Sequence, residues 1–424
     1  MKRPLLLLLV LLSMPPLRAQ KSDAPFMGIL TWNVFEDQIS EEKVKLLADA
    51  IVDLQLDKAG YRYICIDDCW ALPERDSKGH LQPNPQKFPS GFHSLTSYLH
   101  SKGLKAGIYS DAGHHTCSGS QPGSLGHEKV DARDFAQWGF DLLKYDFCNS
   151  PSNTKDCAIA SYLAMHKALR RQCPSDFIFY VCEWGHLEPW TWASSVGSSC
   201  WRATDDTRDC WVNPTYKGGV LDNIKIFANI WPHTSPGHYS DADMLMCGLH
   251  GSGRSSNAGT DSKGMTQEEY KTQFILWSMW SSPLTLCFDI TTLYDGHSRI
   301  SDLYNPYYEE DLALITHPGV IAIDQDPLGN CAQPLVFNND CLILFKALDH
   351  NQFAVSITNL SNHRQEICLE LSQIPHGLPE GSAITLLDVW NNIPLPGYHT
   401  NDLLAIKLPP HGTELLLIQP PANK

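Results

Sequence analysis

Leu143-Lys144-Tyr145-Asp146-Phe147-Cys148 indicates the fold of this chain, because an apolar, strand-like run ends there on a carboxylate. A second stretch, Trp201-Arg202-Ala203-Thr204-Asp205-Asp206, repeats this arrangement further along the chain. Barrels of eight βα units build their active sites from residues at the C-terminal ends of parallel strands. Two acids in such positions therefore predict a (β/α)8 barrel with a catalytic end.

The segments on either side of these stretches alternate between strand-like and helix-like patterns, as expected of parallel βα units. We predict eight strands, at residues 27–32, 61–67, 105–110, 141–146, 177–183, 200–204, 238–244 and 283–289. Between them lie amphipathic stretches with apolar residues three and four apart, at 42–54, 92–102, 132–138, 159–171 and 267–279. Eight alternations predict closure into a TIM barrel.

The pattern changes after the turn-forming stretch Asp326-Pro327-Leu328-Gly329. Short strands separated by Pro, Gly and Asn follow, at 342–348, 352–358, 366–371, 383–388, 403–408 and 413–418. Such a series predicts an antiparallel β-sandwich. The expected organisation is an α/β fold with a (β/α)8 catalytic barrel in residues 20–328 and a C-terminal β-sandwich domain in 329–424.

Length and charge agree with this organisation and exclude some partners. The 424 residues accommodate a barrel of roughly 250 to 300 residues together with a smaller module. The net charge of -15 argues against nucleic acid and anionic membrane surfaces as partners, because both select basic proteins.

The N-terminus has the features of a secretory signal. Lys2 and Arg3 precede the apolar run Leu5 to Leu12, and the small residue Ala19 follows. We therefore predict a cleaved signal peptide at 1–19 and an exported protein, with periplasmic, extracellular and lysosomal destinations all open. No later segment has about 18 uninterrupted apolar residues, so no membrane span is expected.

Fourteen cysteines fit an oxidising compartment, but they lack the paired spacing of zinc sites. Cys65 and Cys69 flank a pair of acids. They are predicted to lie on a strand and in the turn after it, where their side chains rarely converge on one ion. We expect no metal and no cofactor.

Asp146 and Asp206 form the best candidate pair for hydrolysis of a glycosidic bond with retention, which needs a nucleophilic carboxylate and a second carboxyl as acid and base. Lys144 lies two residues before Asp146, on the same side of the strand, and is expected to hold that carboxylate ionised. Arg202 precedes Asp206 by four residues and could hold a sugar hydroxyl or the neighbouring acid. A salt bridge that merely closes the barrel mouth is the competing interpretation.

Two further groups of strand-end residues could contact a sugar. Asp67-Asp68 follows the second strand, and adjacent buried acids need hydroxyl donors, a cation or water. A sugar supplies such hydroxyls; the alternatives are a metal ion, helped by His114 and His115, and a solvated turn. These histidines lack the spacing that fixes two metal ligands on one helical face.

The remaining candidates follow the first, fifth and seventh strands. Glu183 could accept a hydrogen bond from another hydroxyl, and Trp32 could stack its apolar face on a sugar ring, although either Trp32 or Trp184 is also suited to the core. Asp241 and Asp243 are two residues apart and so lie on one side of their strand.

The chain resembles glycoside hydrolase family 27, which contains α-galactosidases and α-N-acetylgalactosaminidases. The resemblance covers nearly the whole chain and rests on seven ordered motifs: Tyr63-Ile-Cys-Ile-Asp-Asp-Cys-Trp70, His100-Ser-Lys-Gly-Leu-Lys105, Gly107-Ile-Tyr-Ser-Asp-Ala-Gly113, Lys144-Tyr-Asp146, Cys182-Glu-Trp184, Trp201-Arg202 and Gln325-Asp-Pro-Leu-Gly329.

This resemblance implies that Asp146 is the nucleophile and that Asp206, rather than Asp205, is the acid/base. It also implies a disulfide between Cys117 and Cys148. It assigns the sugar pocket to Trp32, Asp67, Asp68, Tyr109, Lys144, Glu183, Arg202 and Asp243.

The resemblance also implies a substrate. Galactosidases of the family have a glutamate after the fifth strand that meets the sugar 2-hydroxyl, whereas galactosaminidases have a small residue there. Glu183 therefore favours a retaining, exo-acting α-galactosidase acting on a carbohydrate with a terminal α-galactose. The alternatives are an α-N-acetylgalactosaminidase, a β-L-arabinopyranosidase, an inactive sugar-binding homologue and a metal-dependent hydrolase.

Some segments depart from the family pattern. Tyr239-Ser-Asp-Ala-Asp-Met244 keeps both acids of a family motif but lacks its Trp, Asn and Pro, and Ile29 replaces a Trp. The usual partner of Cys69 is absent, which predicts a free thiol. Residues 248–264 form a long loop rich in Gly, Ser and Asn, suited to cover the site or to join subunits of a homo-oligomer.

Overall fold

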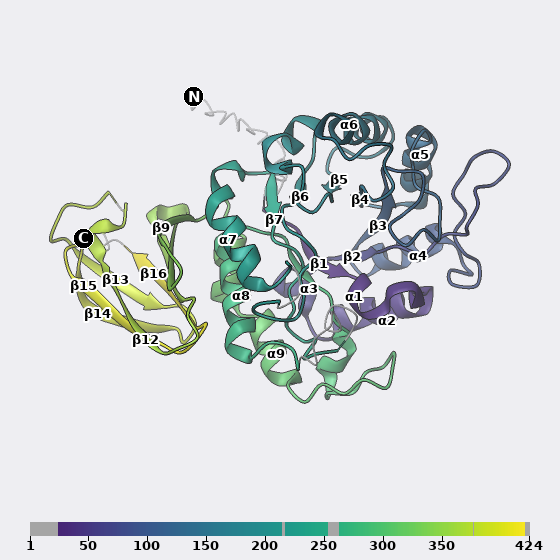
Figure 1. The fold of residues 1–424 in the computed structure, drawn as a ribbon. Coiled ribbons are helices and arrows are strands. Elements are labelled where there is room, and N and C mark those ends of the chain that lie inside the picture. The colour runs from purple at the N-terminus through teal and green to yellow at the C-terminus, as the bar shows by residue number, and fades with distance from the viewer. Residues whose placement is uncertain (1–23, 214–216, 253–262, 376, 420–424) are drawn as a thin grey trace, which may run out of the picture.

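The structure is a computed structural model and describes residues 24–213, 217–252, 263–375 and 377–419. Its N-terminal domain is a ring of parallel strands, and its C-terminal domain is a stack of antiparallel strands beside it (Figure 1). The predicted signal peptide at 1–19 lies outside the described residues, as do ten residues of the predicted loop at 248–264.

The ring contains the eight predicted strands in chain order. They are β1 (Met27–Leu30), β2 (Tyr63–Ile66), β3 (Lys105–Asp111), β4 (Leu142–Asp146), β5 (Ile178–Val181), β6 (Cys200–Arg202), β7 (Tyr239–Asp241) and β8 (Leu284–Leu286). Each strand pairs in parallel with the next, and β1 pairs with β8. A parallel bridge between Leu245, just past β7, and Leu286 closes the ring. The predicted (β/α)8 barrel is confirmed.

Most strands are shorter than predicted, because their last residues leave the sheet and turn into the loops of the catalytic end. Residues 203–204, 242–244 and 287–289 lie beyond the ends of β6, β7 and β8. Asp243 shows why, since its positive φ of 76° does not belong to a strand. Asp243 is part of the site described below.

Helices pack outside the ring. The main ones are α2 (Glu41–Asp53), α4 (Phe92–Ser101), α5 (Glu128–Trp138), α6 (Lys155–Gln172), α7 (Val220–Ile230) and α8 (Gln267–Met279), with short α1 (Trp32–Phe35), α3 (Leu56–Ala59), α9 (Tyr308–Ile315) and α10 (Pro318–Asp324). Polar caps fix several starts: Ser40 caps α2, Thr154 caps α6, and Thr266 with Glu269 forms a capping box on α8.

The C-terminal domain contains a six-stranded antiparallel sheet in the order β14-β13-β16-β11-β10-β9 and a two-stranded sheet of β12 and β15. Their bounds are β9 (Gln333–Phe337), β10 (Cys341–Ala347), β11 (Phe353–Asn359), β12 (Gln365–Glu370), β13 (Ala383–Asp388), β14 (Ile393–His399), β15 (Leu403–Leu408) and β16 (Thr413–Gln419). A separate hydrophobic core lies within this domain. The predicted sandwich is confirmed.

Two strands of this domain were not predicted. Both β9 and β14 contain proline and lie at the two edges of the six-stranded sheet. Proline cannot donate to a sheet hydrogen bond, so it is tolerated at an edge but weakens the sequence signal for a strand.

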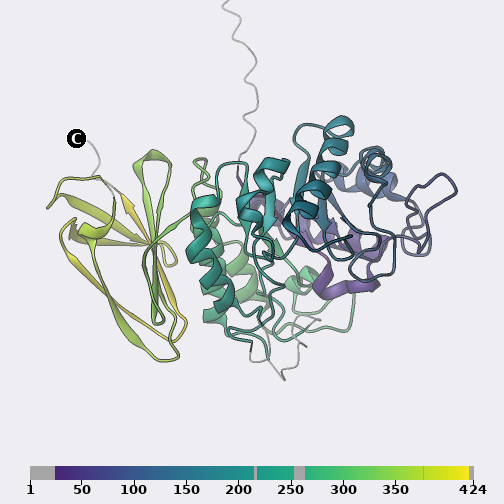
Figure 2. The same cartoon turned by 45° about the horizontal axis from the view of Figure 1, so that its top comes forward.

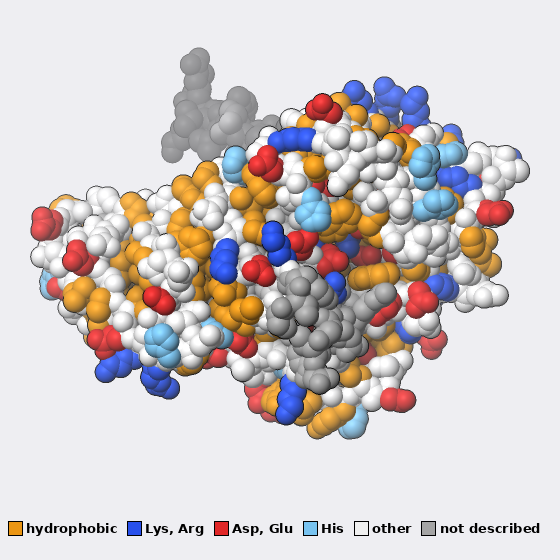
Figure 3. All heavy atoms as spheres, viewed as in Figure 1, with side chains coloured by type: hydrophobic (Ala, Val, Ile, Leu, Met, Phe, Trp, Pro, Cys, Tyr) orange, Lys and Arg blue, Asp and Glu red, His pale blue; other side chains and the backbone are white. Residues whose placement is uncertain are grey.

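The two domains are joined by buried polar contacts as well as by packing. Helices α7 and α8 stand next to the sandwich in both ribbon views, and hydrophobic side chains gather along the border between the domains (Figures 1, 2 and 3). Lys346 on β10 donates hydrogen bonds to the Ser278 carbonyl at 3.0 Å, the Ser281 hydroxyl at 2.8 Å and the Ile323 carbonyl at 2.6 Å. A cation from one domain is therefore solvated by oxygens of the other.

Within the described residues, none of the helices combines the length and the apolar character that crossing a membrane requires.

Candidate active site

The first part of the site joins strands β2 and β4. The Lys144 ammonium donates to Asp67 Oδ2 at 2.8 Å, and both side chains are buried. Burial alone would lower the pKa of Lys144, but the nearby Asp67 carboxylate reverses this and raises it well above the usual value. The ion pair thus keeps a positive charge beneath the site.

Asp68, next to Asp67, is held by backbone donors. Its Oδ1 accepts from the Cys69 N–H at 2.7 Å and its Oδ2 from the Ser118 N–H at 2.9 Å. Burial nevertheless raises the pKa of Asp68. The two neighbouring buried acids are thus accommodated by a cation on Asp67 and by amide dipoles on Asp68.

Asp146, the last residue of β4, is the least satisfied acid of the site. Its Oδ1 is buried and has no hydrogen-bond partner. Burial, with added repulsion from Asp111 and Asp206, raises the pKa of Asp146 to about 8, although Lys144 and the Tyr109 hydroxyl oppose the shift. We expected Lys144 to hold Asp146 ionised. Lys144 does lower the pKa of Asp146, but it is paired with Asp67, and burial outweighs its effect.

The second part of the site is centred on Arg202, at the end of β6. Its guanidinium donates to Asp206 Oδ1 at 2.8 Å and forms an ion pair with Asp243 Oδ1 at 2.7 Å. The Arg202 side chain is 1% exposed, whereas that of Asp206 is 54% exposed. The surrounding protein raises the pKa of Asp206, but Arg202 outweighs it and the net shift is downward. Of the two uses we predicted for Arg202, the structure contains the contact with the acid.

Asp205, the neighbour of Asp206, has a different partner. Its Oδ1 lies 2.6 Å from Nε2 of His186, which belongs to the loop after β5. Asp206 is therefore the member of the pair that is bound to the buried arginine.

Glu183 lies just past β5 and is fully buried. Its Oε2 accepts from the Leu187 N–H at 2.7 Å, while its Oε1 has no partner. Burial raises the pKa of Glu183 to about 8. The free oxygen can accept a hydrogen bond from a hydroxyl that enters the site. A buried carboxyl oxygen without a partner costs free energy, so such a hydroxyl would be bound favourably.

A disulfide joins Cys117 and Cys148, as the family resemblance implied. It links the loop after β3 to the loop after β4, two residues from Asp146. Asp111 lies beside it and accepts from the Cys148 N–H at 2.9 Å. Asp111, Cys117 and Cys148 are close enough to suggest a metal site, but the two sulfurs are bonded to each other and offer no thiolate.

The other predicted site residues lie around these groups. Tyr109 is buried on β3, with its ring 5.5 Å from the Lys144 nitrogen. Trp32 is half-buried and begins α1 rather than ending β1. Cys69, predicted to be a free thiol, is unpaired. His114 and His115 are both exposed on the loop after β3.

Two more residues, Asp111 and Cys182, affect the site but were not predicted from the sequence as site residues. Asp111 opposes Asp146 across the β3–β4 ladder and raises its pKa. The buried thiol of Cys182, next to Glu183, lies within the electrostatic reach of Asp146, Arg202 and Lys144. Both occur in quoted motifs, and their strand-end positions could have marked them.

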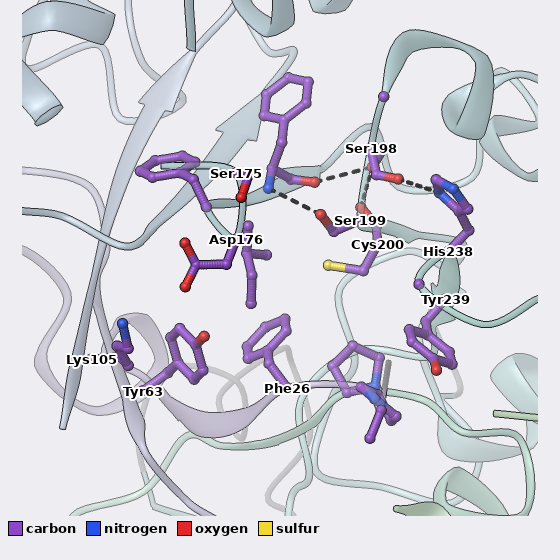
Figure 4. A pocket seen from close by; sticks show the side chains of 18 of the residues that line it. Phe26, Tyr63, Lys105, Ser175, Asp176, Ser198, Ser199, Cys200, His238 and Tyr239 are labelled. Atoms are coloured by element: carbon purple, nitrogen blue, oxygen red, sulfur yellow. Dashed lines mark hydrogen bonds between the residues drawn. The ribbon is translucent and has the colours of Figure 1, made fainter. Parts of the chain in front are cut away.

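A cavity of about 820 Å³ opens at the other end of the barrel, among the first residues of the strands. Lys105 and Asp176 lie on one side of it and His238 and Tyr239 on the other (Figure 4). The predicted acids do not line this cavity. In TIM barrels, this end serves stability and the opposite end serves catalysis.

The arrangement at the catalytic end can carry out acid and base chemistry on a polyhydroxylated molecule. Asp146 offers a carboxylate oxygen with no partner, and Asp206 offers an exposed carboxyl that can exchange protons. Buried acceptors on Asp67, Asp68 and Glu183 are suited to hydroxyl donors. On the molecular surface, acidic and basic side chains lie side by side near the middle of the barrel (Figure 3).

Comparison with known proteins gives a consistent result. Residues 24–304 match the family model described as alpha galactosidase A. An alpha-galactosidase A from Cellvibrio japonicus (strain Ueda107) is 35% identical over 417 residues, which cover 95% of this chain and 93% of the relative. An alpha-galactosidase from Cyamopsis tetragonoloba is 38% identical over 369 residues, which cover 87% and 80%.

A solved structure agrees with these sequence relatives. The crystal structure of alpha-galactosidase I from Mortierella vinacea is 29% identical, with a TM-score of 0.82 over 95% of this chain and 98% of that chain. The likeness therefore extends over the barrel and the sandwich together.

Proposed function

This chain belongs to the alpha galactosidase A family, glycoside hydrolase family 27, and we propose that it is a retaining exo-α-galactosidase. It releases terminal α-linked galactose from oligosaccharides or glycoconjugates. Relatives with this activity match most of the chain, which supports the proposal, and the site supplies the required groups.

The reaction proceeds by two displacements. In the first, Asp146 attacks the anomeric carbon while Asp206 gives its proton to the leaving oxygen, so that a galactosyl ester forms on Asp146. In the second, Asp206 takes a proton from water, the water oxygen attacks the anomeric carbon, and Asp146 is released. Each step inverts the anomeric centre, so the sugar leaves with its original configuration.

The observation that carries this proposal is the buried, unpartnered oxygen of Asp146, together with a second carboxyl that Arg202 holds within electrostatic reach of it. Burial and the neighbouring acids raise the pKa of Asp146, whereas Arg202 lowers the pKa of Asp206. Hydroxyl donors on a bound sugar and the positive charge that develops at the anomeric carbon both favour ionised Asp146. Substrate therefore supports the reactive distribution, with the proton on Asp206.

Substrate choice rests on Glu183. Its free oxygen accepts from a sugar 2-hydroxyl, whereas an N-acetyl group at that position would collide with a buried carboxyl and leave it without a partner. We therefore assign the enzyme to unsubstituted galactosides rather than to N-acetylgalactosaminides.

The test is hydrolysis of three aryl glycosides: the α-galactoside, the α-N-acetylgalactosaminide and the β-L-arabinopyranoside. Proton NMR of the first product formed reports its anomeric configuration. We expect the galactoside to be preferred and α-galactose to appear first. Preference for another sugar would overturn the substrate, and β-galactose as the first product would overturn the mechanism.

We also propose that the protein is exported, which the signal-like residues 1–19 support. N-terminal sequencing of the protein recovered from the medium or an exported compartment should begin at Gln20. Recovery in the cytoplasm with Met1 retained would contradict export.

A further inference from the structure

Asp241 is a buried acid behind the site, and its oxygens are held from three directions. The hydroxyl of Tyr180 on β5 donates to Oδ2, and the Ser282 hydroxyl lies 3.4 Å from Oδ1. Oδ1 also accepts from the backbone N–H of Asp243 at 2.9 Å. Asp241 is fully buried and both of its carboxylate oxygens have protein partners, so neither oxygen is left for a substrate.

The contact with the Asp243 backbone matters because that backbone is strained. Asp243 has a φ of 76°, a region that costs a residue other than glycine about 1 kcal/mol or more. Asp241 holds its N–H, and Trp277 Nε1 donates to its carbonyl at 2.7 Å. The two contacts together keep Asp243 in this conformation.

The strained conformation points the Asp243 carboxylate at the groups that support Asp206. One oxygen lies 2.7 Å from Arg202, and the other accepts from the Thr207 N–H at 2.6 Å. Arg202 in turn donates to Asp206 at 2.8 Å, and Thr207 is the residue directly after Asp206. Asp243 therefore fixes Asp206 both through its side-chain partner and through its backbone.

We propose that Asp241, oriented by Tyr180, is a positioning residue that holds the acid/base Asp206 in place through Asp243. The inference rests on the proposed function, in which Asp206 protonates the leaving group. It adds two side chains that lie behind the site, on β5 and at the end of β7.

This role makes a distinctive kinetic prediction. An activated leaving group, such as dinitrophenolate, departs without a proton, whereas a sugar alkoxide needs one. If Asp206 is misplaced, kcat/KM falls for an α-galactosyl disaccharide but not for the dinitrophenyl galactoside. Proton removal from water in the second step also suffers, so kcat for the activated substrate falls together with KM. Azide, which needs no base, restores that kcat.

The experiment measures both substrates, with and without azide, in Asp241→Asn and Tyr180→Phe. For Asp241→Asn we expect a loss of about 10- to 100-fold in kcat/KM for the disaccharide, less than the full value of an acid/base group. The activated substrate should lose less than about threefold in kcat/KM. Tyr180→Phe should show the same pattern more weakly, and it keeps the test valid if Asp241→Asn does not fold.

Tyr162→Phe is the matched control. It also removes a buried tyrosine hydroxyl, one that donates to the Cys182 carbonyl at 3.1 Å. We expect it to lower the melting temperature without changing the ratio of the two substrates. Equal losses on both substrates in Asp241→Asn and Tyr180→Phe, without azide rescue, would overturn the inference.

Asp206→Ala separates this inference from the proposed function. If Asp206→Ala lacks the leaving-group pattern, the acid/base assignment itself fails. If Asp206→Ala shows the pattern and neither Asp241→Asn nor Tyr180→Phe does, the assignment stands and the positioning role fails alone.

Discussion

The two ends of the barrel differ in a way that their shapes alone do not reveal. The N-terminal end has the cavity of about 820 Å³, but Arg62, Arg170 and Asp176 around it are exposed. At the C-terminal end, Lys144 and Arg202 are buried and held against carboxylates at 2.7 to 2.8 Å.

Burying a charge costs several kcal/mol unless a partner is well placed. Apolar packing is sufficient to stabilise a barrel. A cluster of buried acidic and basic side chains at one end therefore indicates a functional site. The organisation of buried charge, and not the volume of an opening, therefore distinguishes the catalytic end of this barrel.

The largest effect is expected for Asp146→Ala. Without the nucleophile, turnover of aryl α-galactoside should fall by about 10⁴-fold or more. Azide should then enter directly and give β-galactosyl azide, which NMR can identify. Asp176→Asn, at the other end, is the matched control. Residual turnover above a hundredth of wild type would contradict the nucleophile assignment.

Asp206→Ala should have the next largest effect, and it should depend on the leaving group. For a natural α-galactoside, loss of the acid costs about 10²- to 10⁴-fold in kcat/KM. For a dinitrophenyl galactoside the loss should be small, and azide should give α-galactosyl azide. Undiminished rates on both substrates would remove Asp206 from the mechanism.

Glu183→Ser should change the substrate rather than abolish catalysis. A hydroxymethyl side chain leaves space for the acetamido group, so the preference for aryl α-galactoside over the N-acetyl analogue should fall by about 10- to 100-fold. Paired kcat/KM values provide the measurement. Glu188→Ser changes an exposed glutamate on the same loop and serves as control. If the ratio of the two kcat/KM values were unaltered in Glu183→Ser, the proposed clash between Glu183 and the acetamido group would be refuted.

The pH profile of kcat/KM should be a bell with a weakly acidic centre. Above about pH 8 the Asp146–Asp206 pair loses its last proton, so no acid remains; at low pH a second proton neutralises the nucleophile. On the alkaline limb, kcat/KM should fall tenfold for each rise of one pH unit.

The pKa of Glu183 is also raised to about 8, so the variant Glu183→Ser separates the two sources of this limb. If the limb belongs to the pair, it persists in the variant. Disappearance of the limb would assign it to Glu183 instead.

The smallest effect is expected at the N-terminal end. Arg170→Gln changes an exposed residue of the cavity and should leave kcat/KM within about twofold and stability within about 0.5 kcal/mol of wild type. Steady-state kinetics and thermal unfolding check both values. A loss of more than tenfold in kcat/KM would mean that the cavity is coupled to catalysis. The functional difference between the two ends of the barrel would then be wrong.

Most of the fold was predictable from the sequence, because local periodicity determines it. The eight strands and the sandwich follow from alternation, and the resemblance to glycoside hydrolase family 27 is confirmed. The exceptions have local causes. Pro334, Pro394 and Pro396 obscured the edge strands, and residues such as Asp243 leave the sheet earlier than an apolar pattern indicates.

The partners within the site were less predictable. Spacing reveals which side of a strand a residue faces, but not which strand lies opposite across a closed barrel. Lys144 on β4 pairs with Asp67 after β2, and Tyr180 on β5 bonds Asp241 of β7. Both contacts skip a strand, as expected where alternate strands share a layer of the barrel interior. The high pKa of Asp146 depends on burial and neighbours that only the assembled ring supplies.

The Lys346 contact between the domains has a practical meaning for anyone who engineers this enzyme. A gene cut after α10 would remove an ammonium on which the Ser278 carbonyl, the Ser281 hydroxyl and the Ile323 carbonyl converge. Those oxygens and the apolar flank of α8 would then face water. The barrel should therefore not be expressed without the sandwich domain. Tags and fusion partners should also avoid the turn that leads into β14, because the Trp390 carbonyl there lies 3.0 Å from Nε2 of His317 and the two rings stack across the junction.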